Sequence, residues 1–233
     1  MKNNVAFIFA RGGSKEIINK NIQTINNIPL IAYSINIAKK SEIFDDIVIS
    51  TDSDHIAKIA SDYGIKTDDL RPENLASDES PEWLSWQYEV KKYQKKSNFK
   101  TFFSIPCTSP LREVSDIINM KKFYDKNNFD LVLGVSKSEK SPFFNMVKKD
   151  INNSIDKVLL TDKSINRRQE AGDYFDITTV CYITSPDYIL NSKSMLDGSL
   201  GGYEIPKERS LDIDTQYDLY LAELILNANN NRK

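Results

Sequence analysis

The chain has 233 residues, of which 40% are hydrophobic and 27% are charged, a composition typical of a globular domain with a buried core. The formal net charge of −2 gives no basic excess, which argues against a general nucleic-acid or membrane-surface binder. No stretch approaches the roughly 18 apolar residues of a membrane span. Two cysteines form no disulfide framework, so we expect a cytoplasmic protein with reduced thiols.

Apolar runs alternate with helical patterns through the first 136 residues. The apolar runs predict strands at residues 5–10, 46–51, 101–106 and 130–136. Periodicity, N-cap residues, Pro at helix starts and Lys or Gly at helix ends predict helices at 29–40, 53–64, 82–96 and 114–127. This alternation predicts an α/β fold, a Rossmann-like, doubly wound, mostly parallel sheet with right-handed crossovers.

The pattern changes from about residue 138, where shorter strand-like runs follow one another without long helices between them. We therefore predict an antiparallel excursion over about 138–175, after which the chain returns to the sheet. Residues 215–229 are strongly periodic and predict a last helix. No internal repeat or long linker divides the chain, so residues 1–233 are predicted to form one domain.

The segment "RGGSKEIINKN" directly follows the first predicted strand and is rich in glycine and cations. It matches neither G-x-G-x-x-G nor a Walker loop. Ligands of open α/β sheets bind beyond the carboxyl ends of the strands, where this loop begins. Gly12 and Gly13 are expected to allow close backbone approach and φ values that other residues avoid. Arg11 can bind phosphate oxygens in a fork, and Lys15 and Lys20 add charge. These features favour a polyphosphate ligand over a solvated turn with incidental charge.

The segment "SLDIDT" carries Asp212 and Asp214 two residues apart, so both carboxylates face one side of an extended chain. Leu211 and Ile213 are predicted to anchor this segment in the core. Two close carboxylates repel unless a cation lies between them, and Mg²⁺ completed by waters and phosphate oxygens fits that arrangement. The alternative is a helix N-cap by Asp214 or Thr215, which is compatible with a metal role for the aspartates. The cationic loop elsewhere in the chain favours the metal.

Three further loops offer polar groups to a ligand. "CTSPLRE" has the hydroxyls of Thr108 and Ser109, and "LRPENLASD" has Arg71 and Ser77, which can contact a base or a ribose. "NRRQEAGDYFD", residues 166–176, has two arginines able to bind a carboxylate in a fork. For each loop taken alone, an ordinary surface role is an equal alternative.

Nucleophilic catalysis finds little support in the sequence. His55 is the only histidine, so the chain has no Ser/His/Asp triad and no His-rich metal site. Its place at the start of a predicted helix indicates a surface or packing role. Cys107 follows the third predicted strand but has no evident histidine partner.

Taken in order, "ARGGSKEIINKN", "ISTDSDHIAKIASDYG", "RPENLASDES", "CTSPLR", "RRQ" and "LDIDT" resemble the cytidylyltransferases that activate sialic acids and related nonulosonic acids, the acylneuraminate cytidylyltransferase family. The resemblance covers residues 5–223. It implies a nucleotidyltransferase fold of the nucleotide-diphospho-sugar transferase type and a homodimer in which the excursion reaches the neighbouring subunit. It also implies the reaction, in which CTP and a nine-carbon 2-keto sugar acid give the CMP-sugar and pyrophosphate with Mg²⁺.

The resemblance further implies roles for individual residues. The catalytic residues would be Arg11, Lys20, Asp212 and Asp214, and the two aspartates would hold Mg²⁺. The nucleotide would be bound by Arg11, Gly12, Gly13, Ser14, Lys15, Lys20, Asn21, Arg71 and Ser77. The sugar acid would be bound by Thr108, Ser109, Arg168, Gln169 and Tyr182.

The chain departs from the family pattern at several positions. The family usually reads "SKGIPxKN", whereas Glu16 and Ile18 stand here, and an anion at Glu16 is expected either to point outward or to weaken the phosphate loop. Pro106 stands where a glutamine is usual, which removes an expected sugar contact. Asp176 and Thr179 occur in "DITTVCYI", where sialic-acid enzymes often read "RxNGAIYI". These changes favour a different nonulosonic acid, one with an amino or acetamidino substituent.

Two alternatives stay open from the sequence. The first is a cytidylyltransferase for the eight-carbon acid Kdo, although "RRQ", "CYI" and "LDIDT" are closer to the nonulosonate branch. The second is a non-catalytic nucleotide-sugar binder, in which Glu16 would have damaged the phosphate loop. The cation loop and the paired aspartates occur together, which argues against the second alternative, since each is of little use without the other.

Overall fold

The computed structural model describes residues 2–14, 16–77, 79–159 and 172–230. Its centre is a six-stranded sheet in the order β10-β6-β9-β5-β1-β4. The strands are β1 (Lys2–Phe9), β4 (Asp46–Ser50), β5 (Phe99–Ser104), β6 (Leu131–Lys137), β9 (Phe175–Thr184) and β10 (Leu200–Glu204). All neighbours pair in parallel except β9, which runs antiparallel between β5 and β6. The predicted mostly parallel α/β sheet is confirmed.

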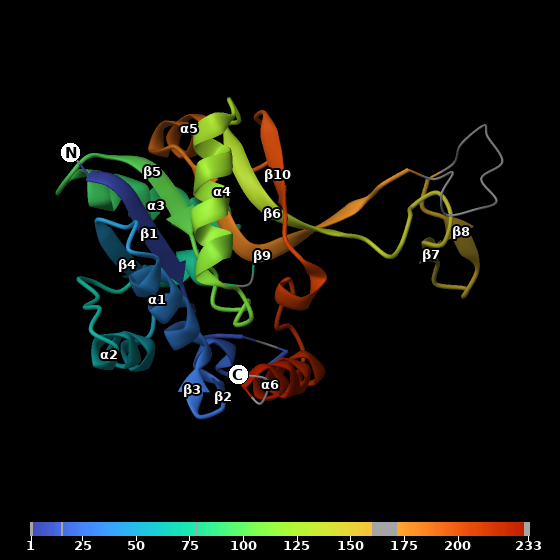
Figure 1. Ribbon diagram of the computed structural model, residues 1–233, viewed down its shortest axis with the longest axis horizontal. Helices are drawn as coiled ribbons and strands as arrows, with labels where there is room; N and C mark the ends of the chain where they lie inside the picture. The colour runs from blue at the N-terminus through green and yellow to red at the C-terminus, as the bar shows by residue number, and fades with distance from the viewer. Residues whose placement is uncertain (1, 15, 78, 160–171, 231–233) are drawn as a thin grey trace.

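Helices cover both faces of this sheet (Figure 1). On one face α1 (Leu30–Ser41) packs beside α4 (Val114–Lys126), and on the other α3 (Glu82–Gln94) packs beside α5 (Pro186–Asn191). The remaining long helices are α2 (Asp54–Asp62), which follows β4, and α6 (Gln216–Asn230), which contacts the small hairpin of β2 (Thr24–Ile25) and β3 (Ile28–Pro29). The predicted helices agree with these bounds to within two residues at each end. Helix α5, strand β10 and the β2–β3 hairpin were not predicted.

Two hydrophobic clusters fill the two faces of the sheet. Alternate residues of a strand point to opposite faces. In β1, Ala6 and Ile8 therefore pack in the cluster beneath α1 and α4, while Val5 and Phe7 pack in the aromatic cluster beneath α3. Trp86 of α3 is fully buried in the second cluster. Burial on both faces explains why the first strand is a nearly unbroken apolar run.

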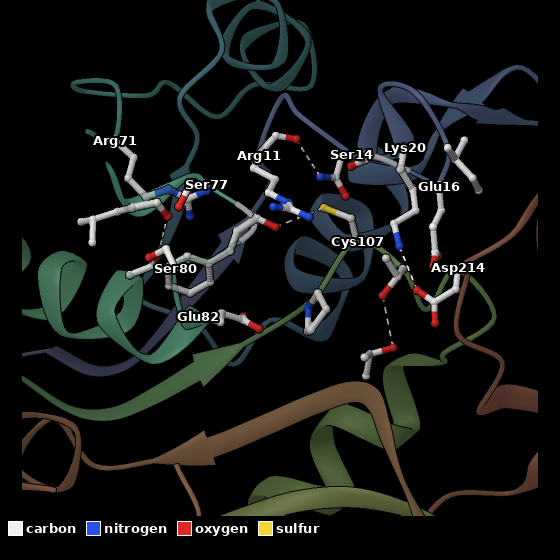
Figure 2. A pocket seen from close by; sticks show the side chains of 18 of the residues that line it. Arg11, Ser14, Glu16, Lys20, Arg71, Ser77, Ser80, Glu82, Cys107 and Asp214 are labelled. Atoms are coloured by element: carbon white, nitrogen blue, oxygen red, sulfur yellow. Dashed lines mark hydrogen bonds and ion pairs between the residues drawn. The ribbon is translucent and has the colours of Figure 1, made fainter. Parts of the chain in front are cut away.

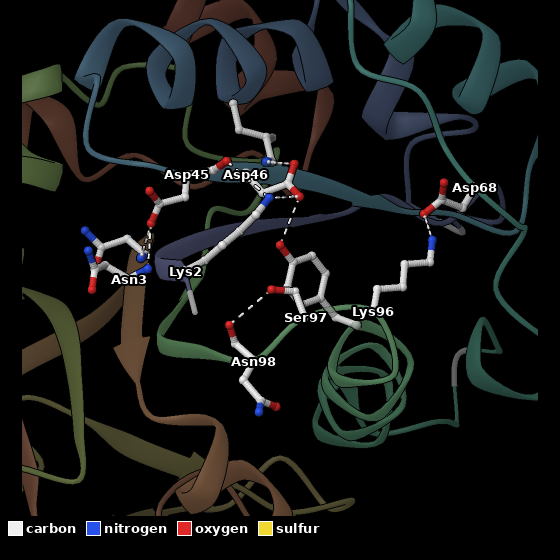
Figure 3. A network of polar contacts seen from close by, with 11 residues as sticks. Lys2, Asn3, Asp45, Asp46, Asp68, Lys96, Ser97 and Asn98 are labelled. Atoms are coloured by element: carbon white, nitrogen blue, oxygen red, sulfur yellow. Dashed lines mark hydrogen bonds and ion pairs between the residues drawn. The ribbon is translucent and has the colours of Figure 1, made fainter.

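A polar network fixes the amino-terminal ends of β1 and β4, at the end of the sheet remote from the glycine-containing loop (Figure 3). The Nζ of Lys2 lies 2.7 Å from Oδ2 of Asp46, and the hydroxyl of Tyr93 donates to the same oxygen at 2.9 Å. The backbone amide of Asn3 donates to Asp45 at 2.6 Å, and this bond is the main cause of the lowered pKa of the Asp45 carboxyl. These contacts fix the pairing of the edge strand.

Between β6 and β9 the chain leaves the body of the molecule as an arm (Figure 1). We use this name for residues 138–159, which carry the antiparallel hairpin of β7 (Val147–Lys149) and β8 (Ile155–Lys157). Every residue of both strands is exposed. The hairpin lies within the segment 138–175 for which the sequence predicts an antiparallel excursion. Within the part of the chain that the structure describes, no helix is long and apolar enough to cross a membrane.

Candidate active site

A cavity of about 570 Å³ lies beyond the carboxyl ends of β1 and β5 (Figure 2). Its walls come from five parts of the chain that are far apart in sequence: the loop after β1, the segment leading into α3, the turn after β5, strand β9 and the segment before α6. Nine of the predicted site residues line it: Arg11, Ser14, Lys20, Asn21, Arg71, Ser77, Thr108, Tyr182 and Asp214.

The beginning and the end of the chain meet in this cavity. The Nζ of Lys20 lies 2.9 Å from Oδ1 of Asp214, a residue 194 positions later (Figure 2). Lys20 opens a short 3₁₀ helix, which the chain enters through Asn19 with a left-handed φ of 55°. The side-chain amide of Asn21 donates to the carbonyl of Arg11 at 3.0 Å. The loop is thereby folded back on itself, with Lys20 facing Asp214.

The two glycines of the loop have different roles. The N–H of Gly12 donates to Oδ1 of Asp52 at 2.9 Å, and a Cβ on Gly12 would lie 3.2 Å from the Cβ of Ser53. A Cβ on Gly13 would meet nothing within 4 Å. Neither residue has a positive φ, so the prediction that both take φ values avoided by other residues is wrong, and neither lines the cavity. The predicted phosphate ligand Lys15 lies outside the described residues.

Asp212 is more enclosed than Asp214. Between them Ile213 is fully buried, and its N–H donates to the carbonyl of Thr108 at 2.8 Å, so it anchors the segment as predicted. The side chain of Asp214 is 60% exposed, whereas Oδ1 of Asp212 is buried without a hydrogen-bond partner among the described residues. Burial is the main cause that raises the pKa of the Asp212 carboxyl. A hydrogen bond from the Thr108 hydroxyl lowers this pKa, and the negative charge of Asp214 raises it further. Such an oxygen is stabilised by a proton or a cation.

The alternative role of this segment, a helix cap, belongs to Thr215. The N–H of Thr215 donates to Oδ2 of Asp218 at 2.7 Å, and the N–H of Asp218 donates to the Thr215 hydroxyl at 3.3 Å. This reciprocal pair caps the start of α6. Asp212 and Asp214 are therefore not needed for the cap.

The donor set fits a hard divalent ion that is shared with a ligand. Among the described residues, no three His, Cys, Asp or Glu side chains gather in a group able to hold a metal. Mg²⁺ is usually held by one or two carboxylates together with waters and substrate phosphates. Asp214 lines the cavity, and Asp212, which does not line it, has an unpartnered buried oxygen two residues earlier; together they supply that number of protein ligands.

The opposite side of the cavity is formed by residues 71–85 (Figure 2). Arg71 is 5% exposed, and its Nη1 donates to the hydroxyl of Ser50 at 3.4 Å. Burial lowers the pKa of this guanidinium, and the carboxylate of Asp52 opposes that effect. Ser77 and Ser80 line the same side. This wall is more polar and less cationic than the side that carries Lys20.

The turn after β5 is held by buried polar contacts. The hydroxyl of Thr108 donates to that of Thr179 at 3.2 Å, and the hydroxyls of Ser109 and Thr179 are 2.7 Å apart. Ser109 is fully buried and does not line the cavity, unlike Thr108. Arg112, to which sequence reasoning gave no role, is 3% exposed and donates to the carbonyls of Pro106 and Ser109. Its only sequence signal is its place in "CTSPLR".

The structure corrects several expectations about single residues, and other expectations concern residues that the structure does not describe. Glu16 lines the cavity near Lys20 and Asp214, so of the two expected outcomes the outward orientation is wrong, and a weakened phosphate loop stays a prediction (Figure 2). Asp176 does not line this cavity, whereas Pro106, Thr179 and Tyr182 do. The expected sugar contacts Arg168 and Gln169 fall outside the described residues.

Among the described residues that line the cavity, none is an evident nucleophile. Cys107 lines it, but burial raises the pKa of this thiol to about 12, so the thiol stays protonated at neutral pH. His55 is exposed on α2 and does not line the cavity. The arrangement is instead suited to binding a polyanion and directing attack by a group of the ligand itself.

A mostly parallel sheet with Lys20 of the cationic loop paired to Asp214 at its carboxyl edge is the arrangement expected of a nucleotidyltransferase. The sequence matches the family described as cytidylyltransferase over residues 5–227, and the chain belongs to that family. The resemblance found in the sequence is thereby confirmed.

Two relatives cover nearly the whole chain. Post-translational flagellin modification protein B of Campylobacter coli is 32% identical over 227 residues, which are 96% of this chain and 94% of that protein. CMP-N,N′-diacetyllegionaminic acid synthase of Campylobacter jejuni subsp. jejuni is 33% identical over 225 residues, again 96% and 94% of the two chains. The solved structure of CMP:2-keto-3-deoxy-manno-octonic acid synthetase complexed with CTP has a TM-score of 0.72 at 15% identity and covers 98% of this chain and 100% of that one. This last likeness confirms the fold.

Proposed function

We propose that this enzyme transfers the CMP group of CTP to a nonulosonic acid of the legionaminic or pseudaminic type, with release of pyrophosphate. The observation that carries the proposal is the contact between Lys20 and Asp214, which joins the cationic loop and the acidic segment before α6 at one cavity. Membership of the cytidylyltransferase family supports the nucleotide, and the relative named CMP-N,N′-diacetyllegionaminic acid synthase supports the sugar class.

The chemistry is an in-line displacement at the α-phosphorus of CTP. The anomeric hydroxyl oxygen of the sugar acid forms the new bond to phosphorus, the bond to the bridging oxygen of the β-phosphate breaks, and the hydroxyl proton passes to solvent. Arg11, Ser14, Lys20 and Asn21 line the cavity where they would bind the triphosphate. Fixed donors of this kind stabilise the charge that grows on the departing pyrophosphate.

Asp212 and Asp214 would hold Mg²⁺, which would neutralise phosphate charge when bound. The sugar acid would lie toward Thr108, Thr179 and Tyr182, which line the cavity beside the turn after β5. Among the departures from the family pattern that were expected near the sugar, Pro106 and Thr179 reach the cavity, so these two residues, rather than Asp176, would set the choice of sugar.

The proposal includes a homodimer in the cytoplasm, where CTP is made. The arm carries large apolar side chains that the body of this chain does not cover: Met146 is 41% exposed, Val147 55%, Ile151 97% and Ile155 61%. An isolated two-stranded hairpin is marginally stable in water. A second copy of this chain is the partner that we propose for it.

A pyrophosphate-release assay with CTP and Mg²⁺ tests the proposal across N-acetylneuraminic, legionaminic and pseudaminic acids and the eight-carbon acid Kdo. We expect release with a legionaminic or pseudaminic acid, slower release with N-acetylneuraminic acid, and none when the sugar is omitted. A clear preference for Kdo would replace the proposal by the Kdo alternative. CTP binding without release of pyrophosphate from any acid would indicate a non-catalytic binder.

A further inference from the structure

Glu82, the first residue of α3, places a carboxylate in the cavity that the phosphate chemistry does not use. The indole N–H of Trp86 donates to Oε1 of Glu82 at 3.0 Å, a contact between residues one helical turn apart. No Lys or Arg among the described residues forms an ion pair with this carboxylate. Trp86 is fully buried and packs against Trp83 and Phe102, so it holds the carboxylate in a fixed position.

The position of Glu82 excludes it from the phosphate end of the site. Figure 2 shows Glu82 on the side of Arg71, Ser77 and Ser80, whereas Lys20 and Asp214 lie on the other side. A carboxylate would repel a triphosphate, so it must face a part of the ligand that carries hydrogen-bond donors. Desolvation is the main cause that raises the pKa of the Glu82 carboxyl. The hydrogen bond from the indole N–H of Trp86 and, less strongly, the positive charge of Arg71 oppose this rise. Glu82 is solvent-exposed and lines the cavity, so its carboxylate is accessible to a bound ligand.

The edge of cytosine matches the two groups on this side of the cavity. Cytosine presents an exocyclic amine as a donor, whereas uracil presents an oxygen acceptor at that position. A carboxylate accepts from an amine but repels an oxygen, and the guanidinium of Arg71 can donate to the ring acceptors of cytosine. Glu82 and Arg71 line the same side of the cavity, where a bound base would meet both (Figure 2).

We propose that Glu82 selects cytosine over uracil by accepting a hydrogen bond from the exocyclic amine of CTP. The inference rests on the proposed function for the identity of the nucleotide. Trp86 is a positioning residue in this scheme, because it orients the carboxylate and lies beneath it. Ribose and sugar hydroxyls are the other donors that a ligand could offer, and the experiment separates them from the amine.

The test compares Glu82→Gln with the wild-type enzyme, because Gln keeps the shape of the side chain and can donate to the oxygen of uracil. We expect the ratio of kcat/KM for CTP to that for UTP to fall by about tenfold to a hundredfold, the range of one good polar contact to a base edge. Glu73→Gln is the matched control, since Glu73 is exposed in the same segment and does not line the cavity. It should keep the wild-type ratio.

A second probe is the CTP analogue in which hydrogen replaces the amine. For the wild-type enzyme, kcat/KM should be lower with this analogue than with CTP by a similar factor. For Glu82→Gln, kcat/KM should differ little between the analogue and CTP. An unchanged CTP to UTP ratio in a folded Glu82→Gln protein would overturn the proposal, and so would an equal loss for both nucleotides or an effect confined to the KM of the sugar acid.

Calorimetric binding of CTP, UTP and the analogue to wild-type protein, without sugar, separates this inference from the proposed function. If no sugar acid gives pyrophosphate, the proposed function fails. Tighter binding of CTP than of UTP or the analogue, lost in Glu82→Gln, would still support base selection by Glu82, and equal binding of all three would overturn it.

Discussion

Single charged residues decide what this cavity can bind. The ion pair of Lys20 and Asp214 is partly open to solvent, with side chains 17% and 60% exposed. Such pairs contribute little to stability, because solvent screens them and ordering the side chains costs entropy. The buried oxygen of Asp212, which lacks a partner among the described residues, opposes folding. These groups are therefore better explained by ligand binding than by stability.

We expect Lys20→Ala and Asp212→Ala each to lower turnover more than a hundredfold. Loss of one fixed donor or metal ligand at a developing charge costs on the order of 3 kcal/mol of barrier. Thermal unfolding should show Asp212→Ala to be as stable as the wild type or more so, since a costly buried charge is removed. Lys58→Ala and Asp62→Ala, both exposed on α2, serve as controls with normal turnover. Near-normal rates in both site variants would contradict the mechanism.

The two buried thiols predict a fall in stability at alkaline pH. Burial raises the pKa of Cys107 and of Cys181 from 9.0 to about 12. Above pH 9 the unfolded chain loses these protons while the folded chain keeps them, so stability that is full below pH 9 decreases as pH rises toward 12. We expect the free energy of unfolding by urea to fall by about 2 kcal/mol between pH 8.5 and 10, at about 1.4 kcal/mol per pH unit and thiol. The double variant Cys107→Ala, Cys181→Ala should have a shallower slope, and equal slopes would contradict the assignment.

At the scale of elements, the loop after β1 depends on one of its two glycines. Gly12→Ala should lower the free energy of unfolding by about 1 kcal/mol, because the new methyl group must displace Ser53 or the loop. Gly13→Ala meets nothing within 4 Å and has no positive φ, so it should be neutral or raise stability by up to about 1 kcal/mol. Urea denaturation measures both. Equal effects of the two substitutions on the free energy of unfolding would show that the contact with Ser53 does not cause the loss of stability in Gly12→Ala.

Most long elements could be predicted from local signals, and the elements that were missed lack such signals. The apolar run of β1 and the caps of α1 and α2 mark their own positions. Strand β10 reads "LGGYE", and its two glycines have low strand propensity, so its pairing with β6 decides its structure. Helix α5 has six residues, too few to show a period.

The site residues also divide into those with a local signal in the sequence and those without one. The cations after β1 can be recognised in the sequence because they directly follow a predicted strand. The acids before α6 can be recognised because they lie two residues apart, just before a predicted helix. The role of Arg112 follows from its buried hydrogen bonds to the turn after β5, and the place of Glu82 in the cavity follows from how α3 packs on the sheet; no local pattern reports either. The orientation of Glu16 was missed because one residue in a loop can turn either way.

At the scale of the whole molecule, the sheet brings distant segments together, and the hairpin of the arm stays exposed. In the hairpin, Val147 lies opposite Lys157 and Lys149 opposite Ile155, so all four side chains share one face. The two apolar members are 55% and 61% exposed. The other face carries Lys148 and Asp156. One face of the hairpin thus combines two apolar side chains with the aliphatic parts of two lysines. This face is apolar enough to pack against another protein surface.

We expect the double variant Val147→Asp, Ile155→Asp to be a monomer, because two charges would be buried unpaired in the proposed interface. Light scattering after size exclusion should give the wild-type chain about twice its 26.7 kDa and the variant about one such mass. Leu196→Asp is the control, since Leu196 is 51% exposed but lies outside the arm, and it should leave the mass unchanged. A wild-type monomer at micromolar concentration, or a dimeric double variant, would show that the hairpin does not join two copies. Because the site described here is lined by one chain, the monomeric variant should still bind CTP in calorimetry even where its turnover falls.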